Sequence, residues 1–240
     1  MKTKTEPKNK SHKNSDLFRT EGFEFPGICS FSREADNRVP APRTFDLLDK
    51  IEKNIRKSLD EYMEYLLEYN KKVNLISRQM KIEELRRLVS ETILLEKYIS
   101  GDTILDAGSG NGLLGIPIAL LNPDKKIVLV ETKAKKAEFL EKAKTRLELT
   151  NVRVFCSSIE EYIKKHPEKG RTLVTRGFPV LEAIVNFVKK GLVKEAVLIT
   201  SENKLKKIKI DMVNTRKKTY NVPLRKNLKI LKMENVSRET

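Results

Sequence analysis

The chain has 240 residues, of which 39% are hydrophobic and 34% are charged, and its formal net charge is +16. This length is enough for one well-buried α/β domain with short additions at its ends. The sequence has no run of about 18 apolar residues, the length that suggests a membrane-spanning helix. No apolar segment follows the basic N-terminus as it would in a secretory signal. We therefore expect a protein that neither spans a membrane nor carries a secretory leader.

The chain contains two cysteines, Cys29 and Cys156, which lie far apart in the sequence. Their spacing predicts neither a disulfide framework nor a zinc site. We expect both to be small apolar side chains of a cytoplasmic protein, in a reducing compartment. The two histidines, His12 and His166, fall in a predicted tail and a predicted turn. Metal binding and histidine-based acid–base chemistry are therefore not expected.

The positive charge is concentrated in the last quarter of the chain. Residues 189–240 hold 15 Lys and Arg against 5 Asp and Glu, a net charge of +10. Such a basic region attracts phosphate polyanions because binding releases their counterions. The alternative is a lysine-rich surface that only keeps the protein in solution. The candidate RNA-contacting residues are Lys204, Lys206, Lys207, Lys209, Arg216, Lys217 and Lys218.

Three segments follow one another along the chain. Residues 1–44 have few apolar positions and four prolines, which predicts a mostly disordered extension. Residues 45–100 show apolar positions three and four apart, as in Leu59, Tyr62, Met63 and Leu66, and predict a helical cap. A second cap helix is expected over 82–98. Residues 101–240 are expected to form the main, cofactor-binding domain.

In the main domain, β-rich runs alternate with helical stretches. This alternation predicts βαβ units: a parallel sheet with helices on both faces. Two further β-like runs, 218–222 and 228–232, predict an antiparallel hairpin at the sheet edge. The expected strands are 103–107, 126–131, 152–156, 172–175 and 196–200, and the expected helices are 114–121, 134–149, 159–165 and 180–190.

A glycine-rich segment directly follows the first predicted strand. It runs Asp106-Ala-Gly108-Ser-Gly110-Asn-Gly112, and glycines let a ligand approach the backbone closely. Such a loop lies where ligands bind in open α/β sheets, outside the carboxyl ends of the strands. A tight turn without a ligand is the alternative. We expect this loop and the basic region to lie at different edges of the sheet.

The position of the glycines relative to the end of the strand favours S-adenosylmethionine over a dinucleotide. Residues 110–115 match the dinucleotide pattern GxGxxG, but the earlier frame that begins at Asp106 sits directly behind the strand. There a carboxylate would repel a pyrophosphate and would suit the ammonium group of a methionine moiety. Glu131, after the second strand, is expected to accept hydrogen bonds from ribose hydroxyls, although NAD sites use the same device and a solvated glutamate is the alternative. The predicted cofactor is S-adenosylmethionine.

Four stretches resemble the bacterial 16S ribosomal RNA guanine-N7 methyltransferase family, also called glucose-inhibited division protein B. They are LLEYNKKVNL, LDAGSGNGLLGIPIAL, SSIEEY and VTRGF, and the resemblance runs from about residue 59 to 232. It implies a class I methyltransferase fold: a Rossmann-like, seven-stranded, mostly parallel sheet whose last strand is antiparallel, behind an N-terminal helical extension. It also implies S-adenosylmethionine as cofactor and ribosomal RNA or the small ribosomal subunit as partner; we expect a monomer.

The resemblance also implies site residues. Gly108 and Leu113 would line the cofactor site, Glu131 would bind the ribose, and Ile159 and Glu160 would flank the adenine. Arg176 would face the site and is the candidate catalytic residue. Without the family, Glu160 is equally a first-turn helix acid, and Arg176 a strand-end cation that pairs with an acid. The full predicted cofactor set is Asp106, Gly108, Gly110, Gly112, Leu113, Glu131, Ile159, Glu160 and Arg176.

The sequence departs from the family at three places. The usual His-x-x-Asp-Ser is replaced by a segment that includes Leu88 and Glu91, an acid that usually opens the fourth strand is Arg171, and a lysine after the fifth strand falls at about Ser201. These changes were expected to alter the substrate side. The leading hypothesis is a ribosomal RNA guanine-N7 methyltransferase. The alternatives are an RNA- or ribosome-associated binding protein with altered or lost activity and, third, an NAD-dependent dehydrogenase.

Overall fold

The computed structural model describes residues 46–177, 181–207, 215–223 and 225–236. All of them belong to one compact unit of the chain. The disorder expected for residues 1–44 and the candidate Lys209 lie outside the described residues. The side chain of Lys207 is likewise not described.

A seven-stranded sheet forms the centre of this unit, with the strand order β3-β2-β1-β4-β5-β7-β6. Five strands are parallel, and β7 runs antiparallel to both of its neighbours, β5 and β6. The fold class and the terminal antiparallel hairpin predicted from the sequence are confirmed. The strands are β1 Thr103–Ala107, β2 Lys126–Glu131, β3 Val152–Cys156, β4 Thr172–Arg176, β5 Glu195–Ser201, β6 Thr215–Asn221 and β7 Leu228–Asn235.

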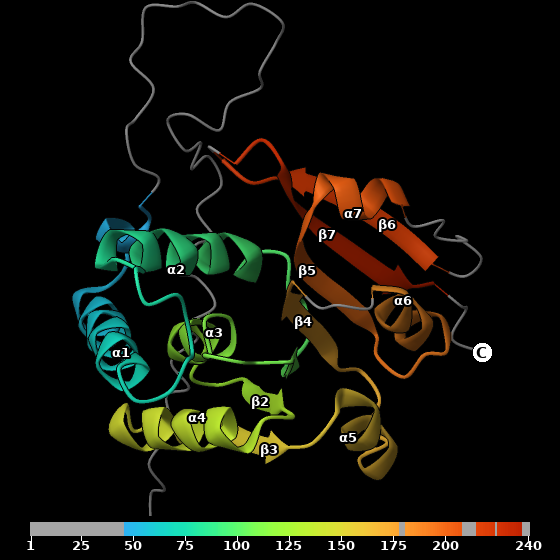
Figure 1. The fold of residues 1–240 in the computed structure, drawn as a ribbon. Helices are drawn as coiled ribbons and strands as arrows, with labels where there is room; N and C mark the ends of the chain where they lie inside the picture. The colour runs from blue at the N-terminus through green and yellow to red at the C-terminus, as the bar shows by residue number, and fades with distance from the viewer. Residues whose placement is uncertain (1–45, 178–180, 208–214, 224, 237–240) are drawn as a thin grey trace, which may run out of the picture. The chain divides into compact units, whose positions relative to one another are not determined.

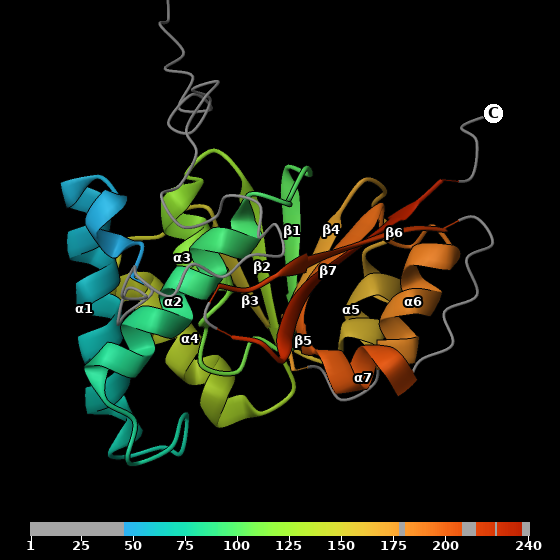
Figure 2. The ribbon, with the colours of Figure 1, turned by 90° about the horizontal axis from the view of Figure 1, so that it is seen from above.

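Helices cover both faces of the sheet (Figures 1 and 2). Figure 2 shows α3 and α4 on one side and α5, α6 and α7 on the other. The inner strands β1, β2, β4 and β5 are therefore buried on both faces, which explains their continuous apolar runs. On one side, Leu105, Leu173 and Leu198 belong to a core that includes α5 and α6. The helices are α3 Gly115–Leu121, α4 Ala134–Arg146, α5 Ile159–Lys165, α6 Leu181–Lys189 and α7 Glu202–Lys207.

Two helix predictions differ from the structure. Helix α4 was expected to run to residue 149 but ends at Arg146, because Glu148 adopts a positive φ of 53°. A residue in this left-handed region is a common end of a helix, and Leu149 N–H donates back to the carbonyl of Lys144. The short helix α7 was not predicted, since its six residues are too few for a periodic signal.

The N-terminal helices α1 (Lys53–Asn70) and α2 (Ile82–Glu96) pack beside α3 on one side of the sheet. Their apolar stripes are buried; in α1 the stripe is formed by Leu59, Tyr62, Met63 and Leu66. This is the amphipathic pattern that the sequence predicted. The helices cover α3 and α4, so they lie against the part of the main domain that follows the glycine loop.

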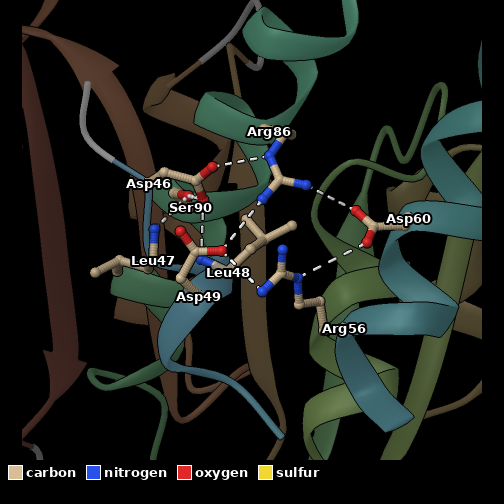
Figure 3. A network of polar contacts seen from close by, with 8 residues as sticks. All are labelled: Asp46, Leu47, Leu48, Asp49, Arg56, Asp60, Arg86 and Ser90. Carbon is tan, nitrogen blue, oxygen red and sulfur yellow. Dashed lines mark hydrogen bonds and ion pairs between the residues drawn. The ribbon is translucent and has the colours of Figure 1, made fainter. Parts of the chain in front are cut away.

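A polar network ties the first described residues to both cap helices (Figure 3). The Arg86 guanidinium donates to Asp46 at 2.8 Å and to Asp60 at 2.9 Å, and Arg56 pairs with Asp49 at 2.9 Å. Ser90 Oγ accepts a hydrogen bond from the N–H of Leu47, which precedes the short 3₁₀ helix η2 (Leu48–Lys50). We interpret this network as structural: it fixes the angle between α1 and α2.

Cys156, which was expected to be a small apolar side chain, lies exposed at the end of β3. Strand β3 is an edge strand, so one side of its terminal residue lacks a neighbouring strand. The glycine loop was expected at a sheet edge, but it follows β1, which lies between β2 and β4 in the interior of the sheet.

Candidate functional site

The glycine loop joins β1 to α3 at the carboxyl end of the sheet. The N–H groups of Gly108 and Ser109 both donate to the carbonyl of Val130 in β2, at 2.9 and 3.0 Å. This double hydrogen bond holds the loop over the end of the neighbouring strand. Gly108 is exposed and Gly110 partly exposed, so the loop presents backbone to solvent where β1 ends.

The glycines of this segment have two different tasks. A Cβ atom on Gly115 would lie 2.1 Å from Leu129 Cδ2, so this glycine allows α3 to pack directly on β2. A Cβ atom on Gly110 would have its nearest neighbour among the described residues at 3.7 Å, but the φ of 58° at this residue favours glycine. Space beside Gly110 is therefore open, as the close approach of a ligand to the backbone requires.

Glu131 ends β2 and turns its carboxylate to the glycine loop. One carboxylate oxygen accepts the N–H of Gly110 and the other accepts the N–H of Lys133, each at 2.8 Å. The residue is only 6% exposed, so the alternative of an ordinary solvated glutamate is wrong. Glu131 fixes the loop and still has acceptor capacity, since a carboxylate has about four lone-pair sites.

Asp106 lies within β1 and is 1% exposed, whereas the sequence analysis placed it in the loop. Its carboxylate accepts the N–H of Gly115 at 3.0 Å, which satisfies a backbone donor at the start of α3. Burial raises the pKa of Asp106 to about 7; the charge of Glu131 adds to this effect, and hydrogen bonds from Gly115 and Ser109 oppose it. The predicted contact with a ligand ammonium group stays a prediction.

The turn that begins α5 lies beside the end of β2. The N–H of Ser157 donates to the carbonyl of Glu131 at 3.1 Å, and Ser158 caps α5 by accepting the N–H of Glu161. Ile159 is buried, and Glu160 is an exposed acid in the first turn of α5. The structure thus brings the predicted adenine-flanking pair next to Glu131, and Glu160 also fits the first-turn alternative.

Both cap helices donate side-chain hydrogen bonds to the loop segment. The Tyr62 hydroxyl of α1 donates to the carbonyl of Asn111, and the Thr92 hydroxyl of α2 donates to the carbonyl of Leu113, both at 2.7 Å. Leu113, a predicted cofactor residue, is itself buried. Burial, with the charge of Asp106, raises the pKa of Tyr62 well above its ordinary value, so the hydroxyl keeps its proton as the donor. The sequence analysis did not identify Tyr62 or Thr92 as site residues.

Arg176 ends β4 and pairs with Glu91 of α2, whose side chain is fully buried. The prediction that Arg176 could pair with an acid is confirmed. Arg225 approaches the other carboxylate oxygen of Glu91 at 3.4 Å. Sequence reasoning missed Arg225; the predicted hairpin was the available signal, because the turn after β6 returns to the carboxyl end of the parallel strands.

Of the three departures from the family, the structure places one far from the loop. Arg171 precedes β4 at its amino end, where its guanidinium donates to the carbonyls of His166 and Leu192. The expectation that Arg171 alters the substrate side is therefore wrong. Glu91 and Ser201 lie at the carboxyl ends of the strands; Leu88, on α2, is half-buried.

The candidate RNA-contacting residues occupy two elements. Lys204 and Lys206 are exposed on α7, where Lys206 pairs with Glu202 at 3.1 Å. Arg216, Lys217 and Lys218 are exposed on β6, the edge strand. Side chains alternate along a strand, so the three do not share one face.

Within the described ranges, no group of three or more His, Cys, Asp or Glu side chains could hold a metal ion. The same part of the chain has no helix that is both long and apolar enough to cross a membrane.

The strand order with its antiparallel β7, the glycine loop after β1 and the acid that ends β2 define a class I methyltransferase. Proteins of this class use S-adenosylmethionine as methyl donor, as the loop register predicted. The family described as rRNA small subunit methyltransferase G (GidB) matches residues 55–238, and the chain belongs to this family. The family resemblance seen in the sequence is confirmed, and an NAD-dependent dehydrogenase is excluded.

Individual proteins support this assignment. A ribosomal RNA small subunit methyltransferase G of Brachyspira hyodysenteriae is 34% identical over 180 residues, which are 74% of this chain and 86% of that protein. The protein of the same name from Mannheimia succiniciproducens is 35% identical over 122 residues, 51% of this chain and 56% of that protein. The structure of yhhF from Escherichia coli aligns with a TM-score of 0.51 over 63% of this chain and 88% of that chain; at 17% identity it supports the fold alone.

Proposed function

We propose that this chain transfers a methyl group from S-adenosylmethionine to N7 of a guanine in small-subunit ribosomal RNA. Membership of the rRNA small subunit methyltransferase G family over residues 55–238 is the observation that carries the proposal. The choice of N7 rests on the sequence resemblance. We further propose that the protein acts in the cytoplasm, as a monomer, on the RNA or on the small ribosomal subunit.

The residues at the carboxyl end of β1 and β2 fit this cofactor. The open space beside Gly110 and the exposed backbone of Gly108 would receive it, and Glu131 would accept hydrogen bonds from its ribose. Ile159 and Glu160 would flank the adenine, beside the end of β2. Gly112 and Leu113 complete the loop, and the buried Asp106 would act mainly by holding α3 in place.

The chemistry requires alignment more than proton transfer. When bound, S-adenosylmethionine supplies an electrophilic methyl carbon on a positively charged sulfur. Guanine N7 has an in-plane lone pair and carries no proton, so no general base is required. The contribution of the chain is then to hold the acceptor in line for displacement. A loop fixed by Glu131, Tyr62 and Thr92 is suited to this task, because it does not reorganise during the reaction.

A second candidate is a protein of the same fold that binds the cofactor and RNA without transferring a methyl group. Leu88 and Ser201 favour it, because they stand where the family usually has a histidine and a lysine.

A labelled-methyl assay separates the two. Small-subunit ribosomal RNA and assembled small subunits from cells that lack the gene should each be tested as acceptor, and N7-methylguanosine should be mapped in ribosomal RNA with and without the gene. We expect a single N7-methylguanosine that depends on the gene. Cofactor binding without methyl transfer to either acceptor would favour the second candidate.

A further inference from the structure

Two arginine side chains from distant parts of the sequence converge on one buried carboxylate. Arg176 at the end of β4 and Arg225 in the turn between β6 and β7 both pair with Glu91 of α2. Arg87 lies one turn earlier on α2, pairs with Glu84, and has a buried Nε atom. We call these four residues the arginine cluster.

The charges of the arginine cluster do not balance. Two guanidinium groups pair with one carboxylate, and Glu91 is fully buried while the Arg176 and Arg225 side chains are 21% and 32% exposed. Arg87 also pairs with Glu84, but both of those side chains are largely exposed, so this pair neutralises little. Burial is the largest influence on Arg176 and lowers its pKa, an effect that the neighbouring Arg225 and Arg87 increase.

The hydrogen-bonding capacity of the cluster is also not used up. Among the described residues of the cluster, the donors Arg176 Nη1 and Arg87 Nε and the acceptor Glu91 Oε1 are buried atoms without a hydrogen-bond partner, although Arg225 lies 3.4 Å from Glu91 Oε1 as an ion-pair partner. An unpaired buried donor costs free energy that a suitable acceptor would recover. Guanidinium groups prefer planar, multiply accepting anions, and a phosphate offers such oxygens.

The position of the cluster connects it to the cofactor loop. Glu91 precedes Thr92, whose hydroxyl holds the carbonyl of Leu113 in the loop segment. Arg176 ends β4, the neighbour of β1, and a Cβ atom on the next residue, Gly177, would have no atom of a described residue within 4 Å apart from its chain neighbours. The cluster therefore lies at the same end of the sheet as the glycine loop.

We propose that the arginine cluster binds a phosphodiester group of the RNA next to the reacting nucleotide, with Glu91 as the internal anion that keeps the arginines in place. Arg176 and Arg225 contact the phosphate, and Arg87 adds charge. In this role Glu91 is a positioning residue. The inference rests on the proposed function, since it names the part of the site that holds the RNA backbone.

The test uses the full chain with S-adenosylhomocysteine and deproteinised small-subunit ribosomal RNA as the binding probe. Arg225→Gln should weaken RNA binding about tenfold and reduce the slope of log affinity against log salt by roughly 0.7 to 0.9, the value for one phosphate contact. Its affinity for S-adenosylhomocysteine should equal that of the wild type. Arg225→Lys should restore the slope but only part of the affinity, because a lysine cannot bind bidentately.

A matched control removes one exposed arginine elsewhere. Arg153 is exposed on β3, the opposite edge strand, and Arg153→Gln should leave both slope and affinity unchanged. A wild-type slope in Arg225→Gln, or an equal loss in Arg153→Gln, would overturn the proposal. If Arg225→Gln does not fold, Arg87→Gln replaces it, because the ion pair of Arg87 within the described part of the chain is with Glu84, at a partly exposed position.

The two proposals fail in distinguishable ways. If wild-type protein transfers no methyl group to ribosomal RNA, the proposed function fails, while the salt slopes still decide whether the cluster holds phosphate. If methyl transfer occurs but Arg225→Gln leaves KM for RNA unchanged, only the cluster proposal fails. We expect KM for RNA to rise several-fold in Arg225→Gln and kcat to change less.

Discussion

Two acids at strand ends show how single residues prepare the site. Asp106 and Glu131 both use backbone N–H groups of the loop segment as partners, Gly115 and Gly110 respectively. Asp106 is almost completely buried, whereas Glu131 lies at the end of its strand with some exposure. The first is therefore suited to hold the fold, and the second to meet a ligand.

The pH dependence of stability should reveal Asp106. Burial raises its pKa to about 7 in the folded state, against about 3.9 in an unfolded chain. Because the folded protein binds the Asp106 proton more tightly than the unfolded chain, this group raises the free energy of unfolding. The contribution is complete below about pH 4 and is lost as the pH rises through about 7. The melting temperature without cofactor should therefore fall between pH 5.5 and 8 more in the wild type than in Asp106→Asn, which keeps an acceptor for Gly115. Parallel melting curves for the two proteins would contradict this assignment.

Glu131 should matter for the cofactor. Glu131→Gln keeps an acceptor for the N–H of Gly110 but replaces one acceptor oxygen by a donor. We expect its affinity for S-adenosylhomocysteine to fall by roughly 1–3 kcal/mol, the usual cost of an unpaired buried polar group. Calorimetry measures the affinity, and an unchanged melting temperature without ligand shows that the fold is intact. Glu160→Gln, on the exposed first turn of α5, is the companion variant. Full affinity of Glu131→Gln for S-adenosylhomocysteine would show that Glu131 is not part of the cofactor site.

At the scale of elements, the glycine loop and the cap helices form one supported unit. The loop donates hydrogen bonds to the carbonyl of Val130 in β2. It also accepts hydrogen bonds from the hydroxyls of Tyr62 in α1 and Thr92 in α2. The helical cap thus contributes to the site although it supplies none of the predicted cofactor residues.

A pair of glycine variants separates the two tasks within the loop segment. In Gly115→Ala the new methyl group would meet Leu129 at 2.1 Å, so the free energy of unfolding should fall by about 1–3 kcal/mol. In Gly110→Ala the methyl group has space but the positive φ is strained, which costs about 1 kcal/mol. Cofactor affinity should fall more in Gly110→Ala. Urea unfolding and calorimetry give both numbers; equal cofactor losses with equal stabilities would contradict the division.

The sequence allowed most of the elements, but only part of the site, to be predicted. The strands β1, β2 and β3 were predicted with their observed bounds. In β1 and β2 the reason is burial on both faces, which gives short apolar runs between turn residues, whereas the edge strand β3 is a short β-rich run. The glycine loop was recognised because its neighbours in the sequence are its neighbours in space. Tyr62 contacts Asn111 across a long sequence separation for which a single sequence gives no signal, and for Arg225 the predicted hairpin indicated the end of the sheet but not its contact with Glu91.

At the scale of the whole molecule, the cofactor should stabilise the fold. S-adenosylmethionine and S-adenosylhomocysteine should each raise the melting temperature, because a ligand that binds only the native state stabilises it by mass action. NAD and NADP at the same concentrations should have no effect. A shift produced by the dinucleotides alone would be incompatible with the cofactor assignment.

The basic C-terminal region reaches the sheet through β6, whose register divides its three cations between two faces. Lys217 lies opposite Met233, which belongs to the core under α6. Arg216 and Lys218 lie opposite Glu234 and Lys232, and Lys232 donates to the carbonyl of Tyr98 on the other side. Directly opposite residues share a face of the sheet. Arg216 and Lys218 therefore lie on the side of the cap helices, and Lys217 on the side of α6.

Lys217, on the opposite face of β6, is a control for Arg216 and Lys218. If the RNA lies across the cap-helix side, neutralising Arg216 and Lys218 to Gln should reduce the slope of log affinity against log salt by roughly one to two units, about 0.7 to 0.9 per phosphate contact. Lys217→Gln should leave the slope unchanged. Cofactor affinity should be the same in both variants, because three strands separate β6 from β1. Methyl transfer should fall mainly through weaker RNA binding, with little change at saturating RNA. Salt titrations of RNA binding decide the outcome: equal effects from both faces would indicate nonspecific attraction by an exposed edge, and wild-type slopes in both variants would remove β6 from the RNA-binding surface.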